Sequence, residues 1–400
     1  MADPPHILIA GAGYAGLAAY VACRDDLERG DIAVTVVNAD DRHLLLPELP
    51  LYLAGESGPD QVRLYLRNAV RPPAQVQVAT ILRIEPDGPA LLCEDPVGRL
   101  RADGLLVALG SVSDDFGVPG VREHATAIGH WEDMSELRER LLADLHSKTA
   151  AAVAIVGGGF TGVEIASELA GRARETGSGL QVTLVAPSVL PGMPDGVRRT
   201  AVRALQTLHV RTIDGRAEAV EAGRIRLHGG EVVEAASIVW AAGVRANPVV
   251  GESGLPVNRR GQVRVDGCLR AAPRLYLAGD CAEIQDEKTG QHLAPTAQAA
   301  MQAGPAAARN LLRELRGRET EPFTPSDRGF LVSLGHGAAA GRIGDHQVAG
   351  GDIALLKRLI ENYHAFQVGG LKALARRLTG GAERRQGGHR EPVGAGARRE

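Results

Sequence analysis

Two glycine motifs constrain the fold of this chain more than any other feature. One of them follows the apolar run Val153–Val156 and contains the spaced glycines Gly157, Gly159 and Gly162. Glycine at the first position permits a tight turn, at the second it lets a diphosphate approach the backbone, and at the third it lets helix and strand pack closely. A helical pattern follows at once, so the free N–H groups of its first turn face the anion. This order of strand, glycine turn and helix predicts a dinucleotide-binding unit.

The same motif occurs a second time near the N-terminus. Residues His6–Ala19 contain Gly11, Gly13 and Gly16 at the same spacing. In each copy a second strand follows the helix, and the copy ends in an apolar segment that closes on Gly110 or Gly243. We therefore interpret the chain as an internal duplication. Two intact motifs favour two dinucleotides, with FAD at the first and a nicotinamide cofactor at the second, over the alternative that one copy is vestigial.

Composition excludes several classes of protein. A chain of 400 residues predicts two or three domains. The net charge of −3 gives no sign of a nucleic-acid partner. The four cysteines, Cys23, Cys93, Cys268 and Cys281, form neither a C-x-x-C nor a C-x₄-C pair and show no metal-ligand spacing. We therefore expect no redox-active disulfide and no metal site, and we interpret each cysteine as a small buried residue.

The chain shows no sign of export or of a membrane span. A strand is expected from His6, which leaves no room for a signal peptide. No apolar run approaches the length that crosses a bilayer. We expect a cytosolic protein, or one attached to a membrane from its cytosolic side.

Several separated motifs resemble those of the type II NADH:quinone oxidoreductases, a family of flavoproteins with two dinucleotide-binding domains. The motifs are GAGYAG (Gly11–Gly16), HLLLPELP (His43–Pro50), ALGSVSDDFGVPGV (Ala108–Val121), GGGFTGVE (Gly157–Glu164), WAAGVRANP (Trp240–Pro248), YLAGDCAE (Tyr276–Glu283) and PTAQAAMQ (Pro295–Gln302). Their shared order over about His6 to Leu378 makes the resemblance specific.

The resemblance implies an α/β fold with two Rossmann-like three-layer domains and a C-terminal membrane-associating segment. We expect the FAD-binding domain to comprise residues 1–112 and 247–330, and the NAD(P)H-binding domain residues 113–246. A β-like and amphipathic helical docking region is expected over 331–378, and a disordered tail over 379–400.

The resemblance also implies the residues of the cofactor sites. For FAD these are Gly11, Gly13, Tyr14, Ala15, Gly16, Asn38, Ile81, Ala108, Gly110, Asp280 and Ala297. For the nicotinamide cofactor they are Gly157, Gly159, Phe160, Thr161, Gly162, Ala186 and Gly243. Asp280 is expected to bond the ribityl chain, where a carboxylate makes charge-assisted hydrogen bonds to a polyol. It also suits a helix N-cap, and the two roles are compatible.

Three residues are expected at the reacting groups. Glu164 lies in the first turn of the second-unit helix, beside the expected nicotinamide, where the alternative is a carboxylate that only complements the helix dipole. Gln298 and Gln302, at i and i+4, border the quinone site in the family; ordinary helix-surface polarity is their alternative. His43 and His336 are further candidates for proton delivery, although a lone histidine is more often structural.

The acid that usually binds the adenosine ribose is missing from both second strands. Asn38 takes its place in the first unit and can still bond a ribose. In the second unit Ala186 removes the carboxylate that favours NAD over NADP, and no arginine follows it directly. We expect NADH as the donor, with weak discrimination against NADPH.

The C-terminal part of the chain is basic and amphipathic. Residues 352–400 carry ten Lys and Arg against five Asp and Glu. Apolar stripes beside Lys357, Arg358 and Lys372 are typical of a helix at a lipid surface, but they would equally suit packing against the flavin domain. Gly369 and Gly370 predict two short helices instead of one.

The predicted function is that of a non-proton-pumping, FAD-dependent NADH:quinone oxidoreductase, bound peripherally at the cytoplasmic face of the cell membrane. A quinone and the membrane surface are the expected partners, and a homodimer is compatible with the family. The alternatives are a sulfide:quinone oxidoreductase, which would need paired cysteines, a soluble reductase of a protein or small-molecule acceptor, and a nucleotide-sensing regulator without turnover.

Overall fold

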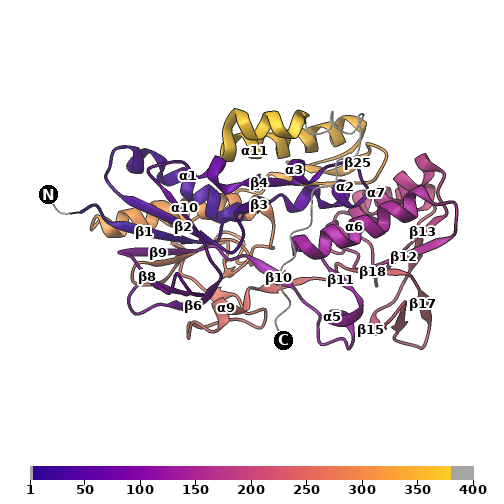
Figure 1. Ribbon diagram of the computed structural model, residues 1–400, viewed down its shortest axis with the longest axis horizontal. Helices are drawn as coiled ribbons and strands as arrows, with labels where there is room; N and C mark the ends of the chain where they lie inside the picture. Colours follow the sequence, from indigo (N-terminus) through magenta and orange to yellow (C-terminus); the bar gives the residue numbers. More distant parts are fainter. Residues whose placement is uncertain (1–2, 380–400) are drawn as a thin grey trace.

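Two mainly parallel β-sheets, each with one glycine motif at the end of a central strand, form the frame of the molecule. The computed structural model describes residues 3–379. The first sheet has the order β21-β22-β9-β1-β2-β5 and the second β11-β18-β12-β13-β14 (Figure 1). Only the β21–β22 pair is antiparallel. The predicted α/β class with two Rossmann-like units is confirmed.

The strands of the first sheet are β1 (His6–Ala10), β2 (Ala33–Asn38), β5 (Gln75–Val78), β9 (Gly104–Val107), β21 (Arg270–Ala272) and β22 (Leu275–Leu277). Those of the second are β11 (Thr126–Ala127), β12 (Ala151–Val156), β13 (Leu180–Val185), β14 (Arg211–Ile213) and β18 (Ser237–Trp240). The central strands are apolar without alternation because both faces of each sheet are covered. Ile7, Leu8 and Ile9, for example, are all buried.

Three antiparallel sheets supply further layers. They are built from β6 (Ile81–Glu85), β7 (Ala90–Cys93) and β8 (Arg99–Arg101); from β15 (Ala217–Glu221), β16 (Arg224–Leu227) and β17 (Val232–Glu234); and from β24 (Gly329–Ser333), β25 (Ala339–Ile343) and β26 (His346–Gly350). Shorter pairs join β3 (Arg42–Leu44) to β4 (Arg63–Tyr65), β10 (Ser111–Ser113) to β19 (Val244–Ala246), and β20 (Val263–Arg264) to β23 (Ala282–Glu283). Ile225 and Val233 pack against Ala154 of β12, which gives the second unit its three layers.

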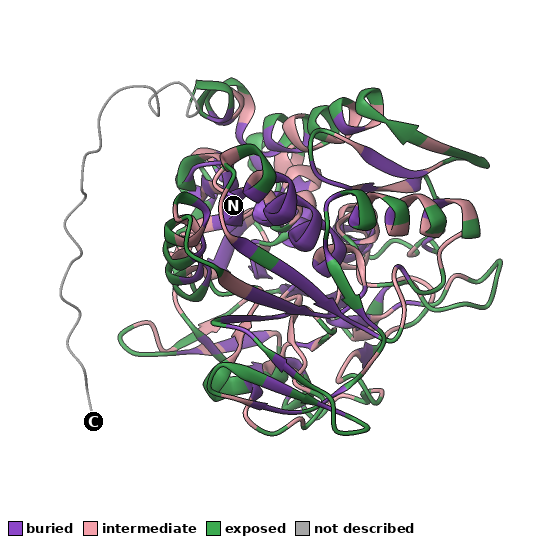
Figure 2. Cartoon of the chain, turned by 90° about the vertical axis from the view of Figure 1, so that its right-hand side faces the viewer, coloured by how far each residue is buried: buried purple, intermediate pink, exposed green. Residues whose placement is uncertain are grey.

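The helices are α1 (Tyr14–Glu28), α2 (Leu49–Leu53), α3 (Pro59–Val62), α4 (Leu66–Ala69), α5 (Val121–His124), α6 (Trp131–His146), α7 (Phe160–Thr176), α8 (Asp195–Thr207), α9 (Pro248–Gly251), α10 (Ala297–Leu315) and α11 (Gly351–Thr379), with one 3₁₀ turn, η1 (Leu46–Glu48). Buried residues concentrate on the strands and on the inner sides of these helices (Figure 2). No helix within residues 3–379 has the length and apolar character needed to cross a bilayer.

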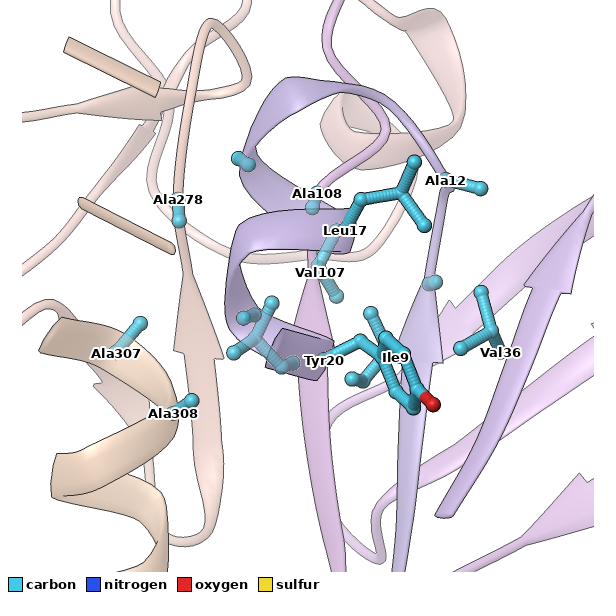
Figure 3. Packing of buried hydrophobic residues seen from close by; sticks show 14 of the residues in the cluster. Ile9, Ala12, Leu17, Tyr20, Val36, Val107, Ala108, Ala278, Ala307 and Ala308 are labelled. Atoms are coloured by element: carbon cyan, nitrogen blue, oxygen red, sulfur yellow. The ribbon is translucent and has the colours of Figure 1, made fainter. Parts of the chain in front are cut away.

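Helices α1 and α10 pack tightly on the first sheet. Figure 3 shows Tyr20 of α1 beside Ile9 of β1, with Ala307 of α10 pointing towards them. The helices approach so closely that a Cβ on Gly304 of α10 would overlap the carbonyl oxygen of Ala15. Small residues at this crossing therefore fix the distance between two segments that lie far apart in the sequence.

The C-terminal helix α11 lies along one side of the molecule (Figure 1). Its helical geometry is interrupted at Gly370, where φ is 66° and ψ is −162°. The prediction of two helices separated at the glycine pair is confirmed. The expected disordered tail lies, apart from Thr379, outside the described residues.

Two expectations about local structure are wrong. The many apolar side chains of residues 41–55 predict a loop that covers a ligand, but these residues form β3, η1 and α2, because Leu49, Tyr52 and Leu53 are buried in the core of the second unit. Cys268 is only partly buried, whereas Cys23, Cys93 and Cys281 are buried as expected.

The α1–α10 crossing gives a prediction about stability. Gly304→Ala should lower the free energy of unfolding by about 1–3 kcal/mol, because the new methyl group forces the helices apart. Glycine to alanine inside a helix normally stabilises instead. Gly171→Ala in α7 is the matched control, since its Cβ would meet the nearest atom, the backbone nitrogen of His336, at 3.4 Å. Chemical unfolding measures both; equal effects of the two variants would contradict the close contact.

Candidate functional site

One large cavity joins the two glycine loops to the C-terminal helix. Its volume is about 2590 Å³, and its walls come from both parallel sheets, from residues 39–50, from α10 and from α11. Eighteen of the predicted site residues line it: Gly11, Gly13, Tyr14, Ala15, Asn38, Ile81, Ala108, Gly110, Gly157, Gly159, Phe160, Thr161, Glu164, Ala186, Gly243, Asp280, Ala297 and Gln298. Gly16, Gly162 and Gln302 do not. Residues chosen from separated motifs thus meet around one space that is large enough for two dinucleotides.

The glycine loops have the geometry of anion-binding turns. Gly11 and Gly157 have φ values of 99° and 127°, which side-chain-bearing residues rarely adopt. A Cβ on Gly13 or Gly159 would meet nothing within 4 Å, so the backbone there is open to a ligand. Helices α1 and α7 start at these two glycines without any side-chain cap. Their free first-turn N–H groups therefore suit the diphosphates of bound dinucleotides.

The third glycine of each motif has a packing role. A Cβ on Gly16 would overlap the carbonyl oxygen of Gly11, and a Cβ on Gly162 that of Gly157. These glycines let each helix begin directly against its own loop. They support the cofactor sites from behind instead of facing the cavity.

Asn38 stabilises the first loop. Its side-chain oxygen accepts a hydrogen bond from the N–H of Ala12 at 2.9 Å, and its side-chain nitrogen donates to the carbonyl of Asp40 at 2.8 Å. Each of these polar atoms retains further bonding capacity towards the cavity. The residue thus joins the end of β2 to the glycine turn.

Asp280 lies at the end of the first sheet, in the cavity wall. The hydroxyl of Ser111 donates to its carboxylate at 2.7 Å. Burial raises the pKa of the Asp280 carboxyl. An acceptor held by one neighbour and facing the cavity fits a hydroxyl-bearing ligand.

The two glutamines of α10 bind backbone. Gln298 donates to the carbonyl of Gly329 at 2.8 Å and accepts from the N–H of Arg328 at 2.9 Å. Gln302 pairs in the same way with both backbone groups of Ser326, at 2.9 and 2.8 Å. They therefore fasten the segment before β24 to α10, and Gln298 alone also reaches the cavity.

Glu164 forms a buried ion pair that sequence analysis did not find. Its carboxylate contacts the ammonium group of Lys357 from α11 and accepts a hydrogen bond from the N–H of Ser333 at 2.8 Å. The pair raises the pKa of Lys357 against the opposing effect of burial. Both residues line the cavity, so α7 and α11 bring opposite charges to one point in its wall.

A second buried polar cluster surrounds Tyr14. Its ring stacks on His364 of α11 at 4.4 Å, and its hydroxyl donates to Glu361 at 3.5 Å. His43 is hydrogen-bonded to the carbonyl of Ala12 at 3.0 Å and lies 3.3 Å from His364, nitrogen to nitrogen. Burial above all lowers the pKa of His43 to about 3 and that of His364 to about 4, so both rings are neutral near pH 7. The other histidine considered, His336, instead pairs with Glu175 and does not line the cavity.

Two carboxyls near α11 titrate in an unusual range. Burial raises the pKa of Glu361 to about 7, assisted by the charges of Glu48 and Glu164 and opposed by Lys357 and Arg377. Burial likewise raises the pKa of Glu168 to about 7, although Ser333 donates a hydrogen bond to it at 2.7 Å. Both carboxyls exchange protons near neutral pH.

Comparisons with known proteins agree with this geometry. The family model described as pyridine nucleotide-disulphide oxidoreductase matches residues 5–304. A curated type II NADH:quinone oxidoreductase of Staphylococcus aureus is 31% identical over 395 residues, covering 92% of this chain and 97% of that protein. The chain belongs to the type II NADH:quinone oxidoreductases.

Solved structures show the same fold at lower identity. The NDH2 of Plasmodium falciparum in complex with NADH superimposes with a TM-score of 0.81 at 16% identity, covering 95% of this chain and 98% of that one. The sulfide:quinone oxidoreductase of Aquifex aeolicus gives a TM-score of 0.77 at 16% identity, with 91% of each chain covered.

This type II NADH:quinone oxidoreductase carries no thiol pair for redox work. Its four cysteines are free and none lines the cavity. Burial raises the pKa of the Cys281 thiol to about 11 and that of Cys23 to about 12. These thiols stay protonated and unreactive.

Glu361 gives the second prediction. Its folded-state pKa of about 7 lies above the ordinary value of 4.5, so the folded protein binds its proton more tightly than the unfolded chain does. Its contribution to stability is therefore complete below pH 4.5 and is lost as the pH rises through 7. Glu361→Gln should gain stability relative to the wild type between pH 4.5 and 8, on the order of 1–3 kcal/mol.

Denaturant unfolding across this pH range measures the difference. Glu94→Gln, at an exposed position, is the control and should show no comparable trend. A pH-independent difference between Glu361→Gln and the wild type would contradict the assignment.

Proposed function

We propose that this protein oxidises NADH and passes the electrons through FAD to a quinone dissolved in a membrane. The observation that carries the proposal is the continuous cavity, because it joins two dinucleotide loops to apolar and ionisable groups of α11. A soluble acceptor would not require the apolar surface of that helix. The S. aureus relative supports the same reaction.

The first glycine loop is assigned to FAD and the second to NADH. The domain boundaries stay as proposed, with residues 1–112 and 247–330 around FAD and 113–246 around NADH. The pairing of β22 with β9 supports this division, because it adds a late segment of the chain to the first sheet. Bound FAD would supply the two-electron chemistry, taking a hydride from the nicotinamide and giving electrons to the quinone.

The protein's own groups would bind and orient the two cofactors and shield them from water. The first turns of α1 and α7 neutralise the diphosphates, Asp280 holds the polyol chain, and the amide of Gln298 fixes the backbone of Gly329 in the cavity wall. Where the cavity walls would cover the bound cofactors, they would exclude water and so strengthen electrostatic contacts at the reacting groups. Gln302 acts as a positioning residue for the same segment.

The quinone is proposed to enter beside α11. Leu356, Leu359, Ile360 and Tyr363 line the cavity, and the last three are exposed to solvent. An apolar head group can therefore pass from lipid towards the ionisable groups Lys357, Glu164 and Glu361 inside. Reduction of a quinone to a quinol consumes two protons, and Glu361, with its pKa of about 7, is suited to hand over one of them.

The outer face of α11 is proposed to dock on the membrane. Its exposed apolar side chains are Leu355, Leu359, Ile360, Tyr363, Phe366, Leu371 and Leu378. Basic residues among them would be attracted to anionic lipid. The protein would thus be peripheral, at the cytoplasmic face, and the homodimer stays a prediction.

Sulfide oxidation is the weaker alternative. A sulfide:quinone oxidoreductase has the same fold, but the sulfide chemistry needs accessible cysteines beside the flavin. The cysteine that lies nearest in sequence to a flavin motif, Cys281, is buried and bonds the carbonyls of Ala278 and Val107 through its sulfur.

Anaerobic spectroscopy tests the reaction. The purified protein should be yellow, NADH should bleach the flavin band, and a short-chain quinone should restore it. If NADH bleaches the flavin but a quinone does not reoxidise it, a quinone is not the electron acceptor. A colourless protein that cannot take up FAD would remove the whole reaction.

Vesicle sedimentation tests the docking face. Changing Leu355, Leu371 and Leu378 together to glutamine should reduce binding to anionic vesicles at least tenfold, since each leucine contributes on the order of 1 kcal/mol of burial in lipid. None of the three lines the cavity, so activity with a water-soluble quinone should persist. The control variant, Leu82→Gln with Val232→Gln, removes exposed apolar side chains elsewhere. Equal loss of binding in both variants would contradict the proposed face.

A further inference from the structure

The second dinucleotide site has an arginine and a histidine near the position where a carboxylate is usual. Strands β13 and β14 run parallel with Val185 opposite Ile213, so their carboxyl ends lie side by side. The N–H of Ala186 donates to the carbonyl of Ile213 at 3.0 Å. Just beyond this point the cavity is lined by Ser188, Arg216 and His228, and none of the acidic residues that line the cavity belongs to these segments.

Arg216, directly before β15, and His228, directly after β16, are neighbours. Ala217 pairs with Leu227 at the start of the β15–β16 hairpin. The N–H of His228 donates to the carbonyl of Arg216 at 2.9 Å, which holds the two residues together at the base of the hairpin. Both side chains are exposed to the cavity. Within residues 3–379 neither side chain has a hydrogen-bond or ion-pair partner.

The segment after β13 is fixed against the glycine loop. A Cβ on Gly158 would lie 2.8 Å from the Cβ of Ala186, and Leu190 donates to the carbonyl of Gly158 at 2.7 Å. The ribose that adjoins a diphosphate on this loop would therefore lie over Ala186. In dinucleotide-binding folds an acid at this strand end bonds the ribose 2′-hydroxyl and repels a 2′-phosphate. Ala186 does neither.

We propose that Arg216 and His228 form a binding site for a phosphate on the adenosine ribose, so that the enzyme binds NADPH as well as NADH. A guanidinium group makes bidentate, charge-assisted hydrogen bonds to a phosphate, and an imidazole N–H supplies a further donor. The inference rests on the proposed assignment of the second loop to the nicotinamide cofactor. It does not depend on the identity of the electron acceptor.

This site could not be predicted from the sequence around Ala186, because no arginine follows Ala186 directly. Arg216 instead lies in the connection that follows the next strand of the sheet, β14, three residues beyond Ile213. The expectation of weak discrimination thereby becomes a specific one: the 2′-phosphate is recognised by Arg216, between β14 and β15, and by His228, directly after β16.

Calorimetric titration of the FAD-loaded, full-length protein tests the inference without turnover. The probes are adenosine 2′,5′-bisphosphate and 5′-AMP, which differ only in the 2′-phosphate. The wild type should bind the bisphosphate about 10- to 100-fold more tightly than 5′-AMP. Arg216→Ala should raise the Kd of the bisphosphate about 10- to 100-fold, and leave that of 5′-AMP within about twofold.

Two further variants complete the test. Arg203→Ala removes an exposed arginine of α8 that does not line the cavity, and should leave both Kd values unchanged. Ala186→Asp restores the usual carboxylate and should abolish the preference for the bisphosphate. Equal binding of the two probes by the wild type, or the same loss in Arg203→Ala as in Arg216→Ala, would overturn the inference. Failure of both probes to bind would overturn the nucleotide assignment of the loop as well.

Discussion

The close approach of each glycine loop to the neighbouring strand is the constraint on which the site depends. A Cβ on Gly11 would overlap the carbonyl oxygen of Ala108, and one on Gly157 that of Ala241. No side chain fits between loop and strand, so the first turns of α1 and α7 begin right at the sheet edge. Their unpaired N–H groups consequently face the cavity, and two anionic cofactors can be held from opposite sides of one space.

The parts of the fold that were predictable are those set by local chemistry. Buried parallel strands require apolar runs, and the tight turns require glycine, so the strands and loops at Val153–Gly162 and at His6–Gly16 could be found from the sequence. The interruption of α11 at Gly370 follows from the same rule. Residues 41–55 could not be assigned in this way, because an apolar side chain can lie either in the hydrophobic core or in the cavity wall. Leu49 lies in the core and Leu46 lines the cavity.

The ionisable groups of the site could not be found in this way. Lys357 meets Glu164, His364 meets His43, and Arg377 meets Glu48 only because α11 folds back over both units. Each partner lies hundreds of residues away, and no local spacing records the pairing. The glutamines of α10 were found by resemblance, yet their hydrogen bonds to the backbone around Ser326 and Gly329 appear only in three dimensions.

Helix α11 places two basic side chains on its inner side and several leucines on its exposed side, and this arrangement would link the proposed membrane contact to chemistry. Its inner side carries Lys357 and Arg377, each paired with a buried carboxylate, while leucines face outward. Removing one partner of a buried ion pair leaves an uncompensated charge and costs about 3–5 kcal/mol. Two such pairs hold the helix in place as a wall of the cavity. On the proposed docking, a lipid surface that binds the outer leucines would contact the same helix that carries Glu361, so the position of the membrane and that of the proposed proton donor would be fixed together.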